Sequence, residues 1–185
     1  ETLSRSAKLT RWPFTNSGRV KGRVSVVVST YKRMDNLLVA IDSVLSQENA
    51  DFELLIVDDN GTPSPYSEEV QAYLAKAVAS SAASRVEYIV HNENLNGAAA
   101  RNTGIMASTG EYVCFLDDDD QYLPGRLSEI VAALQGDKKS FGGVYCGFLG
   151  WNSPENNLDR YPEEDLSKKL ISLDYKQHYL HTNLS

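Results

Sequence analysis

Four consecutive aspartates, Asp117 to Asp120, stand out in this sequence of 185 residues and directly follow the apolar pair Phe115 and Leu116. Each like-charged pair disfavours ionisation of both members, whereas a solvated turn needs only one such residue. A bound divalent cation reverses this balance, and carboxylate oxygens suit Mg²⁺ or Mn²⁺. The cluster therefore predicts a metal site, with Asp119 and Asp117 as its pair because alternate residues turn the same way. The alternative is an acidic surface turn or a capped helix N-terminus.

Polar residues also follow three further apolar runs, at 24–28, 53–57 and 86–90. A carboxylate after the second run can accept N–H bonds from the edge of a nucleobase, and Tyr31 can offer its ring for stacking. The alternatives are an aspartate that opens a turn and a tyrosine that belongs to the core. The residues concerned are Ser29, Thr30 and Tyr31 after the first run, Asp58 and Asp59 after the second, and His91, Asn94 and Asn96 after the third.

The segment from Asn96 to Asn102 combines small side chains with Arg101. Mg²⁺ held by few carboxylates completes its shell with substrate phosphates, and an acidic protein needs such an ion to bind a diphosphate. N–H groups at a helix start and the guanidinium of Arg101 would add positive potential. The alternatives are close helix–sheet packing for the alanines and a surface ion pair for Arg101.

Strand and helix patterns alternate from residue 23 onward, which predicts an α/β fold: a Rossmann-like, mostly parallel sheet with helices on both faces. In such sheets ligands bind beyond the carboxyl ends of the strands, where the polar residues above are expected. The expected strands are 24–28, 53–57, 86–90, 112–116 and 143–149, and the expected helices are 35–45 capped by Asp35 or Asn36, 64–78 capped by Ser64, 97–108, 126–134 and, more weakly, 164–173.

The charge of the chain is unevenly distributed. The net charge is −7, yet residues 1–23 carry six basic groups and one acidic group. The acidic remainder argues against a nucleic-acid partner, because phosphates would be repelled. We expect a basic arm or linker at 1–22 that could contact a membrane surface, one domain at 23–150, and a further region at 151–185. Two cysteines are too few for a disulfide scaffold.

The motifs, taken together, resemble the family-2 glycosyltransferases with the GT-A fold. Each motif alone is weak, but all four occur in order and each follows an expected strand. They are Val24–Tyr31, Val57–Asn60, Asn96–Gly97 with Ala100–Gly104, and Phe115–Asp120, with Tyr122–Pro124 and Arg126–Leu127 behind the last.

This resemblance implies an inverting transfer of a sugar, of the hexosyl or N-acetylhexosaminyl type, from a nucleotide-diphosphate donor to a glycan or polysaccharide acceptor, with Mn²⁺ or Mg²⁺. A UDP-sugar is the expected donor. The resemblance also implies that 23–150 is a nucleotide-sugar-binding domain and that 151–185 is the start of an incomplete acceptor-side region. Asp59 would bond the base, Arg101 would fix the nucleotide, and Asp119 would bind the metal with Asp117. The expected donor-binding residues are Ser29, Thr30, Tyr31, Asp58, Asp59, Asn96, Arg101, Asp117 and Asp118.

The catalytic base of this family is an acidic residue well downstream of the DxD motif, and we expect it beyond Ser185. A haloacid-dehalogenase-like phosphotransferase is one alternative, although Gln121 stands where that class usually has Thr or Val. A truncated module that binds a nucleotide sugar without turnover is another. We expect a cytoplasmic protein, because sugar nucleotides are made there, with the basic arm as a candidate membrane contact.

Overall fold

The computed structural model of the chain describes residues 18–136. Two units divide the chain, residues 1–128 and 129–185, and only 129–136 of the second are described. The expected strand at 143–149, the expected helix at 164–173 and most of the basic arm lie outside the described residues. The described elements are β1 (Val20–Thr30), α2 (Met34–Leu45), β2 (Phe52–Asp58), α3 (Ser67–Ala77), the short 3-10 helix η2 (Val78–Ser80), β3 (Arg85–Val90), α4 (Gly97–Ala107), β4 (Gly110–Asp117) and α5 (Arg126–Gly136).

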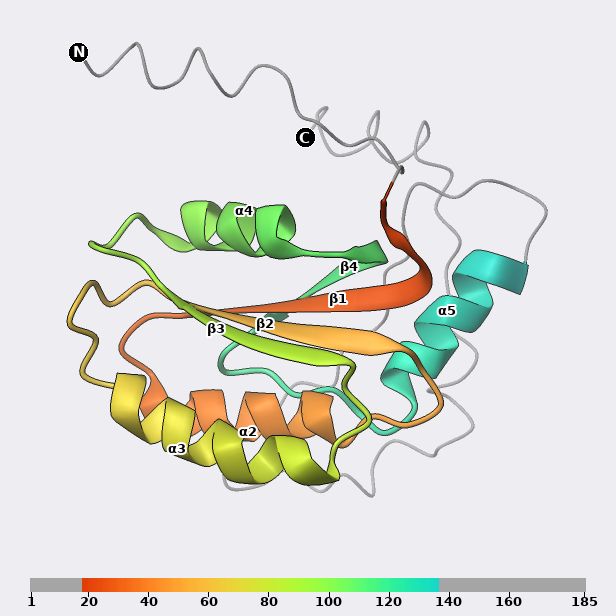
Figure 1. The fold of residues 1–185 in the computed structure, drawn as a ribbon, viewed down its shortest axis with the longest axis horizontal. Helices are drawn as coiled ribbons and strands as arrows, with labels where there is room; N and C mark the ends of the chain where they lie inside the picture. The colour runs from red at the N-terminus through yellow and green to blue at the C-terminus, as the bar shows by residue number, and fades with distance from the viewer. Residues whose placement is uncertain (1–17, 137–185) are drawn as a thin grey trace, which may run out of the picture. The chain divides into compact units, whose positions relative to one another are not determined.

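The four strands form one parallel sheet in the order β3-β2-β1-β4. Helix α4 covers one face of this sheet, and α2 and α3 cover the other (Figure 1). The chain moves from β1 outward to β3 and then crosses to the other side of β1 to form β4, so the direction of winding reverses between β1 and β4. The expected α/β architecture is therefore confirmed for the described residues.

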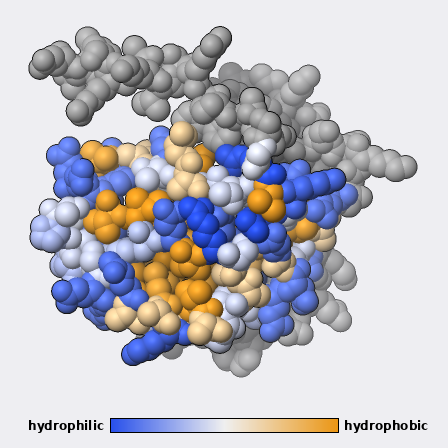
Figure 2. Space-filling view, viewed as in Figure 1, coloured by the Kyte–Doolittle hydropathy of each residue, from blue (hydrophilic) through white to orange (hydrophobic). Residues whose placement is uncertain are grey.

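Burial follows the position of each strand in the sheet. Every residue of the central strand β2 is buried, whereas all residues of the edge strand β3 are half-buried. In β4, at the other edge of the described sheet, half of the residues are half-buried and the others are divided between buried and exposed positions. The side of the molecule seen in Figure 1 carries hydrophobic patches among hydrophilic residues (Figure 2). Apolar edge strands thus contribute less to the core than their composition predicts.

Small residues bring α4 close to the sheet. Ala100 and Gly104 are buried on its inner side, and a Cβ atom added to Gly104 would lie 2.3 Å from Cγ1 of Val27 in β1. Helix–sheet packing therefore accounts for these small side chains. No helix among the described residues combines the length and apolar composition that a membrane crossing requires.

A buried carboxylate joins three strands away from their carboxyl ends. Glu53 in β2 is fully buried and accepts hydrogen bonds from the hydroxyl of Ser25 at 2.6 Å, the backbone N–H of Thr109 at 2.5 Å and the guanidinium of Arg85 at 2.8 Å. Burial alone would raise the pKa of Glu53, but these donors hold it below its usual value. This network fixes the end of α4 and the start of β4.

Two expected helix caps are wrong. Helix α2 begins at Met34 with Arg33 in the capping position and no side-chain cap, so neither Asp35 nor Asn36 caps it. Helix α3 begins at Ser67 with Tyr66 in the capping position and no side-chain cap, so Ser64 does not cap it; the Ser64 hydroxyl donates to the buried carboxylate of Asp58 and accepts from the backbone N–H of Tyr66 at 3.2 Å. Strand β1 begins at Val20, where its backbone N–H donates to Thr109.

Candidate functional site

A cavity of about 290 Å³ lies at the carboxyl ends of β1, β2 and β4 and at the start of α4. This is the point where the winding of the sheet reverses, and open α/β sheets bind ligands at such points. The predicted donor-binding residues converge there, except Asp58 and Asn96. The lining residues are Ser29, Thr30, Tyr31, Arg33, Asp59, Gly97, Ala100, Arg101, Asp117 and Asp118.

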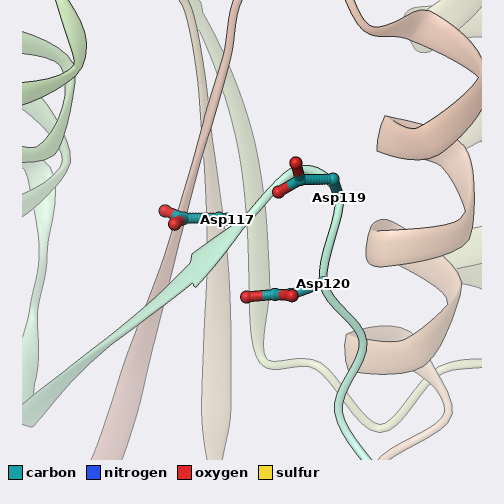
Figure 3. A group of neighbouring side chains, drawn as sticks. All are labelled: Asp117, Asp119 and Asp120. Carbon is teal, nitrogen blue, oxygen red and sulfur yellow. The ribbon is translucent and has the colours of Figure 1, made fainter. Parts of the chain in front are cut away.

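The side chains of three of the four consecutive aspartates lie close together beside this cavity. Oxygen atoms of Asp117, Asp119 and Asp120 all lie within 4.8 Å of one another. The three side chains come from the end of β4 and the turn that follows it (Figure 3). Partial burial, and then the charges of Asp119 and Asp117, raise the pKa of Asp120. A group of hard oxygen donors with excess negative charge fits Mg²⁺ or Mn²⁺.

Asp118 is placed differently from its neighbours, because its side chain is buried and held by protein donors. Only 5% of the residue is exposed. Its carboxylate accepts from the hydroxyl of Thr30 at 2.8 Å and from the guanidinium of Arg33 at 3.1 Å. Thr30, itself buried, therefore fixes Asp118 at the rim of the cavity.

Two arginines face the run Asp117–Asp120, which we call the acidic cluster. Arg101 pairs with Asp117, and Arg33 pairs with both Asp118 and Asp119, with 2.5 Å between its Nη1 and an oxygen of Asp119. The Arg33 side chain is 52% exposed, so it can change partners at little cost. Arg33 was not among the predicted site residues, although a basic residue two positions after Tyr31, in the loop that follows a strand, was a usable signal.

Asp59 lies in the wall of the cavity and is 2% exposed. One carboxylate oxygen is 2.7 Å from Nδ1 of His91 and accepts from the backbone N–H of Leu95 at 2.8 Å. The other oxygen accepts from the side-chain amide of Asn94 at 2.9 Å. The loop after β3 thus holds the Asp59 carboxylate in one orientation.

Asp58 does not reach the cavity. It is fully buried, and its carboxylate accepts from Asn60, Ser64 and Tyr88. Burial and the bond to Asp58 raise the pKa of Tyr88 to about 12. Asp58 therefore shapes the loop behind β2.

Asn96 caps α4 and does not line the cavity. Its side-chain oxygen accepts from the backbone N–H groups of Ala98 at 3.0 Å and Ala99 at 3.3 Å. Its backbone has φ 76° and ψ 164°, a conformation almost restricted to glycine. Two of the helix-start donors expected to supply positive potential are therefore used by Asn96 itself.

A second, larger hollow of about 1000 Å³ is open to solvent along α2 and α3. Asp42, Tyr73, Lys76 and Tyr122 are among the residues that line it. Within residues 18–136, no group of facing carboxylates lines this hollow, and it does not lie at the carboxyl ends of the strands. The smaller cavity is therefore the better candidate site.

A parallel sheet whose winding reverses beside converging carboxylates and arginines defines the class of open α/β proteins that bind their ligands at the carboxyl ends of the strands. Residues 25–182 match the model of the family "Glycosyl transferase family 2". The chain belongs to this family, as the motifs in its sequence indicated.

Two curated relatives illustrate the match. WcaA of Escherichia coli (strain K12), provisionally named as a colanic acid biosynthesis glycosyl transferase, is 32% identical to this chain over 158 residues. These residues are 80% of this chain and 52% of WcaA. The amylovoran biosynthesis glycosyltransferase AmsB of Erwinia amylovora is 34% identical over 122 residues, covering 62% of this chain and 38% of AmsB. The chain thus spans about half or less of these relatives.

Solved structures share the fold. The mannosyltransferase PcManGT from Pyrobaculum calidifontis, solved with GDP-Man and Mn²⁺, aligns with a TM-score of 0.52 at 21% identity, over 72% of this chain and 39% of that one. TarS 1-349 of S. aureus aligns with a TM-score of 0.51 at 24% identity, over 62% of this chain and 32% of that one. The expected GT-A fold is confirmed.

Proposed function

We propose that this chain is the nucleotide-sugar-binding part of a metal-dependent, inverting glycosyltransferase that uses a UDP-sugar to extend a glycan or polysaccharide. The observation that carries this proposal is the convergence of Asp59, Arg101, Asp117 and Asp118 on one cavity at the reversal point of the sheet, with Asp119 and Asp120 grouped beside Asp117. Family membership and relatives named for colanic acid and amylovoran biosynthesis support the same assignment.

The cavity offers distinct groups to a nucleotide. Tyr31 is exposed and its ring can stack on a base, while the Asp59 carboxylate can accept an N–H from the base edge. Ser29 and Asp117, which are register partners on β1 and β4, can bond the ribose. Arg101 lies beside them and can bond a phosphate oxygen.

The DxD motif, Asp117-Asp118-Asp119, would hold a Mn²⁺ or Mg²⁺ ion through Asp119 and Asp117, with Asp120 near enough to assist. The bound ion would stabilise negative charge on the departing nucleoside diphosphate as a Lewis acid. Buried Asp118 would keep the turn in place through Thr30. Arg33 and Arg101 would balance the remaining negative charge of the cluster.

The transfer also needs a carboxylate that deprotonates the acceptor hydroxyl, and this base would lie beyond Ser185. The proposed transfer is of the hexosyl or N-acetylhexosaminyl type and takes place at the cytoplasmic side of a membrane. Residues 1–22 would contact the membrane surface. Because the chain spans 52% of WcaA and 38% of AmsB, a binding module without turnover is the second candidate. Donor hydrolysis by this chain, compared with a longer one, separates the two.

Calorimetry with UDP, GDP and TDP, each with and without Mn²⁺, tests the proposal. We expect metal-dependent affinity for one nucleotide, UDP first, and its loss in Asp119→Ala. Asp51→Ala is a matched control, because Asp51 has the same side-chain exposure of 45% and also pairs with an arginine. Equal binding in the presence of EDTA, or equal losses in both variants, would contradict the metal site.

A further inference from the structure

His91 is a buried side chain that links two walls of the cavity without entering it. The residue is 7% exposed, and its backbone N–H donates to the backbone carbonyl of Asp58 at 2.9 Å. Its Nδ1 is 2.7 Å from Asp59, and its Nε2 is 2.9 Å from the hydroxyl of Thr103 on α4. Arg101, two residues before Thr103, lines the cavity from the same helix.

We propose that His91 is a positioning residue that sets the base preference of the donor site through Asp59. This inference rests on the proposed nucleotide-binding function and adds how the site would choose its base. Because a carboxylate accepts hydrogen bonds, Nδ1 carries the hydrogen, and in the neutral ring Nε2 accepts from the hydroxyl of Thr103. Both ring nitrogens then have partners.

The hydrogen-bond count of Asp59 leaves room for one ligand donor. A carboxylate has about four acceptor positions. Among the described residues, His91, Leu95 and Asn94 fill three of them, two on one oxygen and one on the other. The remaining position is on the oxygen bonded to Asn94, and Asp59 lines the cavity. Three fixed bonds prevent rotation of the carboxylate, so that position keeps a constant direction.

A single acceptor held in one direction selects bases by chemistry. Uracil carries a hydrogen on its ring nitrogen N3 and can donate it to a carboxylate, whereas N3 of cytosine is itself an acceptor and would face Asp59 with like polarity. The site should therefore favour uridine over cytidine nucleotides as long as Asp59 is held. His91 supplies one of the three bonds that hold it.

The arrangement of Asp59, His91 and Thr103 has the connectivity of an acid–histidine–hydroxyl triad, but its geometry does not support nucleophilic catalysis. Among the described residues, neither His91 nor Thr103 lines the cavity. A nucleophile must reach the reacting atom of the substrate. The hydroxyl of Thr103 therefore serves to orient the ring.

The test is calorimetric titration of UDP and CDP, with Mn²⁺, against four variants of the full chain. His91→Phe removes both ring bonds, His91→Asn keeps a donor near Asp59, and Thr103→Val removes only the far hydroxyl. Ser25→Ala is the control, because it breaks a different buried network, at Glu53. Thermal unfolding of every variant reports whether it is folded at the titration temperature.

We expect His91→Phe to reduce the UDP-to-CDP affinity ratio at least tenfold, His91→Asn to restore most of it, and Thr103→Val to reduce it about threefold. Ser25→Ala should lower the unfolding midpoint and leave the ratio unchanged. A ratio in His91→Phe within twofold of the unchanged protein overturns the role of His91, as does an equal loss in Ser25→Ala. If the unchanged protein binds no nucleotide at all, the proposed function fails first, which distinguishes the two failures.

Discussion

Arg33 donates a 2.5 Å hydrogen bond to Asp119, the aspartate that the sequence motif assigns to the metal. The same guanidinium nitrogen lies 3.1 Å from Asp118. A cation that approaches Asp119 must therefore share this carboxylate with Arg33 or displace it. The arginine acts as a counter-ion for a group of like charges that would otherwise repel one another.

Replacement of this arginine should tighten the binding of the metal alone. We expect Arg33→Gln to increase Mn²⁺ affinity, measured without nucleotide by the paramagnetic resonance of free Mn²⁺, by about fivefold, since a partly exposed ion pair is worth up to about 1 kcal/mol. Arg23→Gln is the control, because Arg23 pairs with Asp51 at 3.0 Å elsewhere on the sheet. An affinity that stays at the level of the control would show that Arg33 does not compete with the metal.

The sequence was sufficient to predict the described strands, the helices between them and the end of the sheet that holds the site. These follow from apolar periodicity and from the rule that ligands bind at the carboxyl ends of parallel strands. Seven of the predicted donor-binding residues do line one cavity. What each of them bonds within the chain could not be predicted, because those partners are distant in sequence.

Asp59 and His91 illustrate this limit, since 32 positions separate them and their contact depends on the pairing of β2 with β3. Ser64 shows a different limit: the sequence predicts it as a helix cap, but its hydroxyl donates to the buried carboxylate of Asp58 and accepts from the backbone N–H of Tyr66, and α3 begins only at Ser67. A serine hydroxyl serves equally well in a turn and at a helix start, so local propensity alone does not decide where the helix begins.

Ionised Asp120 should lower the stability of the folded chain and raise its affinity for a divalent metal. Its pKa is raised by partial burial and by Asp119 and Asp117, so the folded chain holds this proton more tightly than the unfolded chain. The corresponding stabilisation is present at pH values below the pKa of Asp120 in the unfolded chain, and it is lost as the pH rises through the pKa in the folded chain. At pH 7 the ionised group is therefore a penalty.

We expect Asp120→Asn to raise the unfolding midpoint at pH 7 in the absence of divalent metal, with a gain in the free energy of unfolding of less than about 1 kcal/mol because solvent screens this exposed group. This gain in stability should become smaller at high salt and disappear at pH 3. The Mn²⁺ affinity of the variant should be lower than that of the unchanged protein. Thermal unfolding over this pH range, with EDTA present, measures the first effect. A loss of stability at pH 7 would mean that Asp120 is held by favourable contacts.

Glu53 should show the opposite pH dependence. Although burial opposes its charge, hydrogen bonds from Ser25, Thr109 and Arg85 keep its pKa below the usual value. Stability from this group is present above the unfolded value and is lost as the pH falls through the lowered folded pKa. We expect Glu53→Gln to cost about 2–3 kcal/mol at pH 7, because charged hydrogen bonds are lost in the core.

Urea unfolding of the Glu53→Gln variant and of the unchanged protein at pH 7 and pH 3 measures this cost. The difference in the free energy of unfolding should be smaller at pH 3 than at pH 7. Glu87→Gln is the control, since Glu87 also pairs with Arg85 but is 39% exposed at its side chain. Equal costs for the two substitutions would show that Arg85, and not the buried network, is what stabilises this part of the sheet.

Gly104 offers a test of how closely α4 must approach the sheet. Alanine normally stabilises a helix over glycine by about 1 kcal/mol, and Asn102→Ala on the exposed side of the same helix should stabilise slightly for this reason. At position 104, however, the added Cβ would lie 2.3 Å from Cγ1 and 2.8 Å from Cγ2 of Val27. Real Cβ atoms do not tolerate such distances, so the helix must move away from β1.

We therefore expect Gly104→Ala to destabilise the chain by about 1–3 kcal/mol, the usual cost of overpacking, and to weaken UDP binding because α4 carries Arg101. The double variant Gly104→Ala with Val27→Ala removes the colliding methyl groups and should recover much of the UDP affinity, although it leaves a smaller core residue. Non-additivity of this pair, measured in both unfolding and calorimetry, is the decisive quantity. Simple addition of the two single costs would show that the glycine is not required for the approach of α4 to β1.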